Sequence, residues 1–486
     1  MLAMLICFQN LGKIKETTLD LRPLTVIIGP NNSNKTYIAY SLYGLWLVLQ
    51  EASLHYPYEA LNMGDDVLSI NINDAFVGRL QGSCETSVRR FQRDIGIFYQ
   101  DSSDRLFSAT SFEVKLSVGD IVDALKRLSG TSFDVFNFDA KLLFSETENK
   151  VSIVSQPQAP LPQDKKQEVV LAAFDRLLRK QLFPQPFLLP AERNAFVITY
   201  KMLANRRYKA LREGYREAFG GKGSVQRRLN LLREGGEVRY PQPVEDFLDF
   251  LTDVESEKPS NTRSPFAKLA DTIESSIQNT NKTRYRSTAL GGKEIITQVE
   301  KGLDIDLYNA SSSIKQLAPL LLYLRYRAKE NDLLIIDEPE MNLHPESQAK
   351  LLEVLAMLVN HGVNVLLTTH SPYLMAHLNN LAQADGTSQA VRNRQAKSLY
   401  LKNPDSLLRM DQVSAYEMKD NQLHSLKDPD YGIRWDTLSD VSADLQQRYF
   451  AIYEEGHAKE RARNGRKTAA TKGGQPASQQ GGEDQP

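Results

Sequence analysis

The segment "VIIGPNNSNKTYIAY" (residues 26–40) constrains the fold most, because a β-branched run enters a polar loop and then an apolar stretch. Its spacing is that of the phosphate-binding P-loop, G-x-x-x-x-G-K-[ST], except that Asn34 stands where the second glycine is expected. Such a loop needs a strand before it and a helix after it, so that backbone N–H groups and the helix N-terminus hold a phosphate. The chain is therefore expected to have an α/β fold of the P-loop NTPase type.

Each position of this loop has an expected role. Lys35 would place its charge on the β- and γ-phosphates of a nucleotide, and Thr36 would offer a hydroxyl to Mg²⁺. Asn34 is expected to weaken the loop without abolishing it, since asparagine is the best tolerated substitute for glycine at positive φ. The alternative is an Asn-rich turn before an ordinary helix. The predicted nucleotide-binding residues are Gly29, Asn31, Asn32, Ser33, Asn34, Lys35 and Thr36.

A second motif, "LLIIDEPEMNLHP" (333–345), ends an apolar strand in two acidic residues. Asp337 is expected to associate with Mg²⁺, together with Thr36, because this ion prefers oxygen ligands. Glu338 is expected to polarise the water that attacks the γ-phosphate, which makes it the predicted catalytic carboxylate. The alternative is a strand that ends in a solvated acidic turn.

A third motif, "LLTTHSPYL" (366–374), delivers His370 at the end of another buried strand. A helix expected at 345–362 separates this strand from the acidic one, which makes a strand–helix–strand unit. His370 is predicted to contact the γ-phosphate and sense its presence. The alternative is a structural histidine.

A serine-rich turn, "NASSSIKQL" (309–317), opens a helix shortly before the acidic strand. Hydroxyls, N–H groups and the helix dipole at such a turn suit an anion. Taken alone, the turn is better explained as a simple helix N-cap formed by Ser311 or Ser312 ahead of an amphipathic helix.

The P-loop and the acidic strand lie about 300 residues apart, so the sheet must be assembled from both ends of the chain. We expect residues 1–50 and 285–455 to form one domain, in which three short strands within residues 1–28 make an antiparallel meander that leads into the P-loop. Residues 51–284 would be a large, mostly helical inserted domain with some strands, and residues 456–486 a disordered tail.

Composition excludes some classes of protein. The formal net charge is -1, and two cysteines, Cys7 and Cys84, cannot form a disulfide framework. No apolar run reaches the ~18 residues of a membrane span and no signal-peptide layout is visible, so a cytoplasmic protein without membrane contact is expected. Residues 201–234 carry ten Lys or Arg against three Glu. Direct DNA binding there is one hypothesis, and a solvated helix face is the other.

Together, these motifs resemble those of the ABC-type ATPase heads of the SMC and RecF group, within the AAA family. "GPNNSNKT", "IIDEPEMNLHP" and "TTHSPYL" are most similar to bacterial ATPases related to the overcoming-lysogenisation-defect (OLD) family, several of which act in anti-phage defence. The stretch "FLLPAERNAF" (187–196) also resembles a family landmark, but its residues alone suggest no role. No segment resembles the Toprim nuclease module that many OLD proteins carry.

The resemblance implies ATP and Mg²⁺ as ligands and a homodimer, or a higher homo-oligomer, formed through the ATPase heads. Ser312 and Ser313 would then contact, in trans, the ATP held by the other copy, and Asn342 and His344 would lie near that interface. Ser313 occupies a position where the family usually has glycine. Because Asn34 and Ser313 both stand where the family usually has glycine, we expect ATP to be turned over slowly.

Two functional hypotheses follow. In the first, an ATP-hydrolysing dimer controls a separately encoded effector, a nuclease or a toxin, in DNA-associated or anti-phage defence. In the alternative, the chain is a nucleotide-gated scaffold or sensor that holds such a partner and hydrolyses little ATP.

Overall fold

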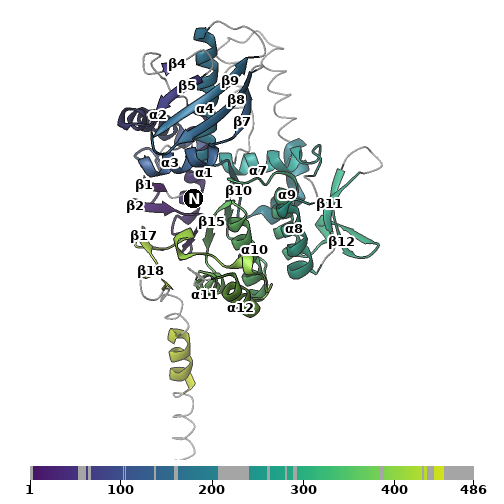
Figure 1. The fold of residues 1–486 in the computed structure, drawn as a ribbon. Helices are drawn as coiled ribbons and strands as arrows, with labels where there is room; N and C mark the ends of the chain where they lie inside the picture. The colour runs from purple at the N-terminus through teal and green to yellow at the C-terminus, as the bar shows by residue number, and fades with distance from the viewer. Residues whose placement is uncertain are drawn as a thin grey trace, which may run out of the picture. The chain divides into compact units, whose positions relative to one another are not determined.

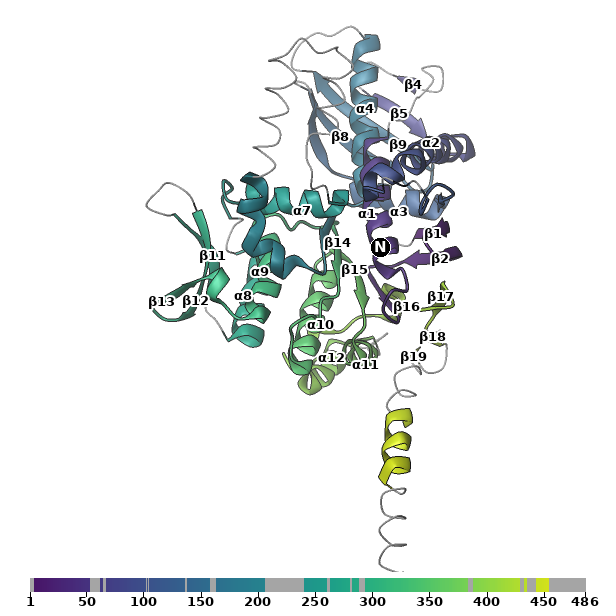
Figure 2. The same ribbon diagram turned by 180° about the vertical axis from the view of Figure 1, so that it is seen from behind.

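The structure is a computed structural model, and residues 1–433 and 434–486 form separate compact units. The second unit contains a helix at 443–453, and the description below concerns the first (Figures 1 and 2). The structure describes residues 4–52, 62–63, 67–101, 103, 105–135, 138–157, 163–205, 240–259, 263–279, 282–287, 293–382, 388–428, 432–434 and 443–453.

A six-stranded sheet forms the centre, in the order β10-β14-β15-β3-β16-β17. The first five strands pair in parallel, and β17 is antiparallel to β16. Every residue of β3, β14 and β15 is buried, which explains why these strands read as continuous apolar runs. The strands are β3 (Leu24–Ile28), β10 (Pro186–Leu189), β14 (Leu333–Asp337), β15 (Asn364–Thr369), β16 (Val413–Lys419) and β17 (Gln422–Ser425).

Helices follow three of these strands, and the sequence predicts the two that follow β3 and β14. α1 (Lys35–Glu51) follows β3 and contacts β10, β14 and β15, whereas α10 (Pro345–Asn360) connects β14 to β15. α11 (Pro372–Leu381) follows β15, and the side chain of Ser371 caps it. Gly44 lets α1 approach the helix at residues 74–99 closely, because a Cβ on Gly44 would lie 2.5 Å from the ring of Phe91 in that helix.

The N-terminal strands partly contradict the sequence prediction. β1 (Met4–Leu11) and β2 (Ile14–Leu21) form the expected antiparallel pair, which β6 (Ser111–Lys115) extends. The expected meander into β3 is wrong, because β3 pairs with β15 and β16 in the central sheet. The burial of all five β3 residues explains this, since such a strand needs cover on both faces.

Residues 51–284 contain more sheet than expected. The five-stranded antiparallel sheet β4-β5-β9-β8-β7 lies within this range, so a mostly helical insertion is not confirmed. Moreover, β6 and β10 from the same range pair with β1 and β14. The boundaries at 50 and 285 stay a prediction. The elements are β4 (Asn62–Met63), β5 (Val67–Asn71), α2 (Asp74–Tyr99), α3 (Val118–Leu128), β7 (Ser132–Val135), β8 (Phe138–Ser145), β9 (Lys150–Pro157) and α4 (Gln163–Leu182).

A helical group lies beside the central sheet. Arg325 of α9 donates two 2.7 Å hydrogen bonds to Glu274 and one to Asp271, which ties α9 to α8 and the π-helical turn after it. The elements of this region are α7 (Gln242–Asp253), α8 (Pro265–Ile273), the turn Glu274–Gln278, β11 (Lys282–Ser287), β12 (Lys293–Glu300), β13 (Leu303–Asp306) and α9 (Ser312–Tyr326). Elsewhere lie α12 (Gln389–Gln395) and the two-stranded sheet of β18 (Lys427–Asp428) and β19 (Gly432–Ile433).

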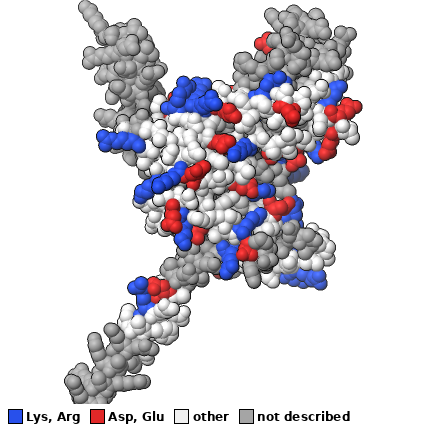
Figure 3. All heavy atoms as spheres, turned by 90° about the vertical axis from the view of Figure 1, so that its left-hand side faces the viewer, with Lys and Arg blue, Asp and Glu red and all other residues white. Residues whose placement is uncertain are grey.

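Two sequence predictions lie largely outside the described residues. These are the basic segment 201–234, of which only 201–205 are described, and the tail 456–486. Lys/Arg and Asp/Glu are interspersed over much of the face in Figure 3. Within the described part of the chain, no helix combines the length and the apolarity that a membrane crossing requires.

Candidate nucleotide site

The candidate site lies at the carboxyl ends of β3, β14 and β15, three neighbouring parallel strands, of which β14 and β15 are labelled in Figure 2. Open α/β sheets bind ligands at this edge. The strand order places β15 between β3 and β14, so the P-loop, the acidic pair and the histidine meet there. They surround a cavity of about 480 Å³ lined by residues 31–37, Glu338 and His370.

The backbone of the loop has the positive φ that was expected at Asn34. Asn32 has φ 59° and Asn34 has φ 68°, both in the left-handed region where asparagine is tolerated. Gly29 is required for a different reason, since a Cβ there would lie 2.8 Å from the Cβ of Met418 on β16. The loop thus adopts its turn with Asn34 at the position where P-loops commonly use glycine.

Lys35 lies at the centre of the loop and is 5% exposed. Its Nζ donates to the carbonyl oxygens of Gly29 and Pro30 at 3.0 Å each, contacts Ser33 Oγ at 3.3 Å, and lies 3.0 Å from His370 Nε2. Burial lowers the pKa of Lys35 to about 8, against the opposing effect of Glu338 and other nearby acids. The Lys35 amine is therefore mostly protonated at neutral pH, and a bound anion would raise its pKa again.

This lowered pKa makes nucleotide affinity dependent on pH. Phosphates bind the charged ammonium, so ATP affinity is expected to fall about tenfold per pH unit above about 8. Titration calorimetry between pH 7 and pH 9.5 measures this. Lys35→Arg keeps its charge throughout and is expected to flatten the profile. Wild-type affinity that does not change across this range would contradict the assignment.

Asp337 is held between two threonine hydroxyls. Thr36 Oγ1 donates to Asp337 Oδ2 at 2.9 Å, and the Thr368 hydroxyl donates to the other carboxylate oxygen. Burial raises the pKa of Asp337 despite these hydrogen bonds. A hydroxyl and a carboxylate in direct contact are the hard oxygen donors that Mg²⁺ prefers, so Thr36 and Asp337 fit the predicted ion.

Glu338 and His370 both line the cavity and contact each other. Glu338 Oε1 lies 3.3 Å from His370 Nε2, the same nitrogen that lies near Lys35. That nitrogen either accepts from Lys35 or donates to Glu338, depending on the tautomer. The hydrogen bond with His370, helped by the charges of Lys35 and Arg193, lowers the pKa of Glu338. Glu338 is thus ionised at neutral pH.

Sequence reasoning missed three residues that hold these groups. Glu340 Oε1 accepts from the His370 backbone N–H at 2.6 Å and from the Thr369 hydroxyl at 2.8 Å. Thr368 binds Asp337, and Arg193 binds the backbone of the acidic pair. The acidic residue two positions after Glu338 and the double threonine before His370 were visible signals. For Arg193 the signal was the resemblance of residues 187–196 to a family landmark, which suggested no role.

The serine turn does not join this cavity in the same chain. Ser311 caps α9 by accepting from Ile314 N–H at 3.4 Å, Ser312 is exposed and Ser313 is half-buried. Neither Ser312 nor Ser313 is among the described residues that line the cavity. Their contact with ATP in a second copy stays a prediction. The proposed interface residues Asn342 and His344 are both exposed.

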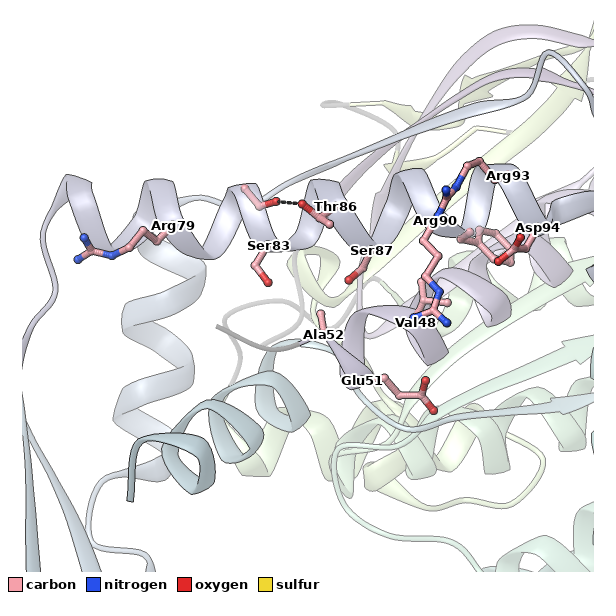
Figure 4. A pocket seen from close by; sticks show the side chains of 12 residues that line it. Val48, Glu51, Ala52, Arg79, Ser83, Thr86, Ser87, Arg90, Arg93 and Asp94 are labelled. Atoms are coloured by element: carbon pink, nitrogen blue, oxygen red, sulfur yellow. Dashed lines mark hydrogen bonds between the residues drawn. The ribbon is translucent and has the colours of Figure 1, made fainter. Parts of the chain in front are cut away.

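A larger cavity of about 720 Å³ lies elsewhere, between the end of α1 and α2. Figure 4 shows Arg90 extending from α2 toward Val48 and Glu51, whereas Arg79 lies far along the same helix. These cations do not converge on one point. The cavity is therefore a weaker candidate for phosphate than the strand-end site.

A family comparison covers part of the chain. Residues 199–376 match a family described as "AAA domain, putative AbiEii toxin, Type IV TA system". The matched range contains the serine turn, Asp337, Glu338 and His370, and it begins after the P-loop. A search of curated proteins found no match.

Solved structures of SMC heads are similar at low identity. An Smc head bound to the C-terminal winged-helix domain of ScpA shows 11% identity over 88% of this chain and 98% of that chain, with a TM-score of 0.33. An Smc head with an extended coiled coil, bound to the C-terminal domain of ScpA from Pyrococcus furiosus, shows 10% over 92% and 99%, with a TM-score of 0.30. The SMC head of Thermotoga maritima shows 10% over 87% and 98%, with a TM-score of 0.29.

These TM-scores are too low to bear on function, so the assignment depends on the chain's own geometry and on the family match. The P-loop between β3 and α1, the acidic end of β14 and the histidine after β15 are arranged around one cavity. Together with the partial match to an AAA domain family, they support a P-loop ATPase.

Proposed function

We propose that the chain binds ATP with Mg²⁺ and hydrolyses it slowly, and that two copies join around the nucleotide to control a separately encoded effector. One observation carries the catalytic part. Lys35, His370 and Glu338 form one contact network at the carboxyl ends of three adjacent strands, beside a cavity. A phosphate chain bound there would meet a cation, a histidine and an ionised carboxylate.

Each residue has a defined task in this proposal. The loop N–H groups and Lys35 hold the phosphates, and His370 contacts the terminal one. Glu338, kept ionised, orients a water molecule and accepts its proton. Thr36 and Asp337 would hold Mg²⁺, which neutralises phosphate charge when bound.

Dimerisation supplies the second half of the proposal. The exposed serine turn at the start of α9 offers hydroxyls and a helix N-terminus, which suit the phosphate held by another copy. Such a contact would make the assembly depend on nucleotide and would release it after hydrolysis. The effector, a nuclease or a toxin, and a role in anti-phage defence follow from the OLD-like motifs.

Sedimentation velocity tests the dimer. The hydrolysis-deficient Glu338→Gln variant is expected to shift from monomer to dimer when ATP and Mg²⁺ are added. Adding Ser312→Arg should keep it monomeric, because a large cation replaces a small hydroxyl at the turn, while ATP binding persists. Saturating ATP that leaves the mass of Glu338→Gln unchanged would exclude dimerisation through the heads.

The second candidate function is a nucleotide-gated scaffold with little hydrolysis. Asn34 favours it, because its left-handed backbone is energetically easier for glycine than for asparagine. ATP-dependent dimers without phosphate release above background would select the scaffold over the enzyme.

A further inference from the structure

Arg193 is a buried cation that the sequence left without a role. It lies three residues after Pro190, in the "FLLPAERNAF" stretch that begins within β10, and it is 2% exposed. β10 pairs in parallel with β14, which brings this stretch to the acidic end of β14. The parallel pairing thus delivers an arginine beneath the candidate catalytic carboxylate.

The guanidinium uses all five of its N–H donors on oxygen acceptors. Nη1 donates to the carbonyl oxygens of Pro190 at 2.9 Å and Asp337 at 2.7 Å, and Nη2 donates to that of Glu338 at 3.1 Å. Nε donates to the backbone oxygen of Gln316 on α9 at 3.2 Å. The side-chain oxygen of Gln316 accepts from Nη2 at 2.7 Å in the amide orientation that satisfies both of its polar atoms.

These five acceptors are carbonyl or amide oxygens, so the charge of Arg193 is not spent on a salt bridge with any of them. Burial lowers the pKa of Arg193 to about 10, while the charges of Asp337, Glu340 and Glu338 oppose that effect. The side chain therefore remains a cation at neutral pH. Its positive charge lies near the carboxylates of Asp337, Glu338 and Glu340 and reduces the repulsion among them.

The backbone of Glu338 explains why such a cation is held there. Glu338 has φ 49°, a left-handed conformation that is unfavourable for a non-glycine residue. Arg193 holds the carbonyl groups on both sides of its Cα, and the Glu338 N–H donates to Thr368 O at 3.0 Å. These bonds fix the direction in which the Glu338 side chain leaves β14.

We propose that Arg193 is a positioning residue for Glu338, an inference that rests on the proposed ATP hydrolysis. It is not among the described residues that line the nucleotide cavity, so its contribution is to hold the Glu338 backbone at the end of β14. Losing it lowers the rate of the chemical step and leaves nucleotide binding almost intact.

Steady-state ATP hydrolysis by Arg193→Met tests this. The variant is expected to lose about 10²-fold in kcat while KM for ATP stays within about threefold, because only the catalytic carboxylate is misplaced. In the Glu338→Gln background, Arg193→Met is expected to lower the residual rate by less than about threefold, since both changes act on one group. If Arg193→Met does not fold, Arg193→Lys carries the test, with a loss of roughly tenfold because lysine lacks the planar five-donor fork.

Arg179→Met is the matched control. Arg179 is also fully buried, but it pairs with Asp175 and contacts Ser83, away from the site. It is expected to lower the melting temperature without lowering kcat at 20 °C. Three results would overturn this inference and leave the proposed hydrolysis standing. Folded Arg193→Met could turn over ATP at the wild-type rate, or both arginine variants could lose kcat equally. Alternatively, Arg193→Met could lower kcat by the full factor of about 10² in the Glu338→Gln background. A wild type that hydrolyses no ATP would overturn the proposed hydrolysis, and this inference with it.

Discussion

Replacing Glu338 by glutamine is expected to lower kcat for ATP hydrolysis by about 10²–10⁴-fold, the usual contribution of a positioned general base. The amide keeps the size of the side chain but cannot accept a proton from water. ATP binding should persist, because Lys35 and the loop are unchanged. Phosphate release measured together with equilibrium binding separates the two effects.

Glu346→Gln is the control for this variant. Glu346 is a half-exposed glutamate on α10 that pairs with Lys350 at 2.7 Å, and it belongs to the same strand–helix–strand unit. Its replacement is expected to leave kcat unchanged. A Glu338→Gln enzyme as active as the wild type would remove Glu338 from the reaction.

Replacing Lys35 by alanine is expected to weaken ATP binding by about 10²-fold, since a buried charge on the phosphates would be lost. The contact between Lys35 Nζ and His370 Nε2 would also be lost. Isothermal titration in the presence of Mg²⁺ measures the change in affinity. Because no nucleotide would be held, turnover should fall as well.

Lys350→Ala provides the comparison for this second change. Lys350 is a partly exposed lysine on α10 whose Nζ reaches Glu346 and the Ser276 carbonyl. Its loss is expected to leave ATP affinity unchanged. Equal affinities in Lys35→Ala and wild type would show that the loop at residues 29–36 is not the nucleotide site.

Much of this site could be predicted because its signals are local. The apolar runs that end at Ile28, Asp337 and Thr369 indicate buried strands, and parallel strands bring their carboxyl ends to one edge. The proposed roles of Asn34, Lys35 and Thr36 follow from loop spacing alone. The positive φ of Asn34 also follows from a local rule about glycine positions.

The non-local parts could not be predicted. Nothing in the residues of β10 indicates that it pairs with β14. Arg193 and Asp337 are 144 positions apart in the sequence, and the strand pairing brings Arg193 to the carbonyl oxygens of Asp337 and Glu338. The same holds for β3, whose neighbours are β15 and β16 rather than β2. The pairing of a strand depends on which of its faces must be buried by other elements. This is set by the whole sheet and not by the residues of one strand.

The most direct test of the account is an experimental structure of Glu338→Gln with ATP and Mg²⁺. The phosphates are expected within hydrogen-bonding distance of residues 31–36 and His370, with Mg²⁺ beside Thr36 and Asp337. The serine turn of a second copy is also expected against the terminal phosphate. Nucleotide bound elsewhere on the molecule, with the strand-end cavity still empty at saturating ATP, would contradict the account.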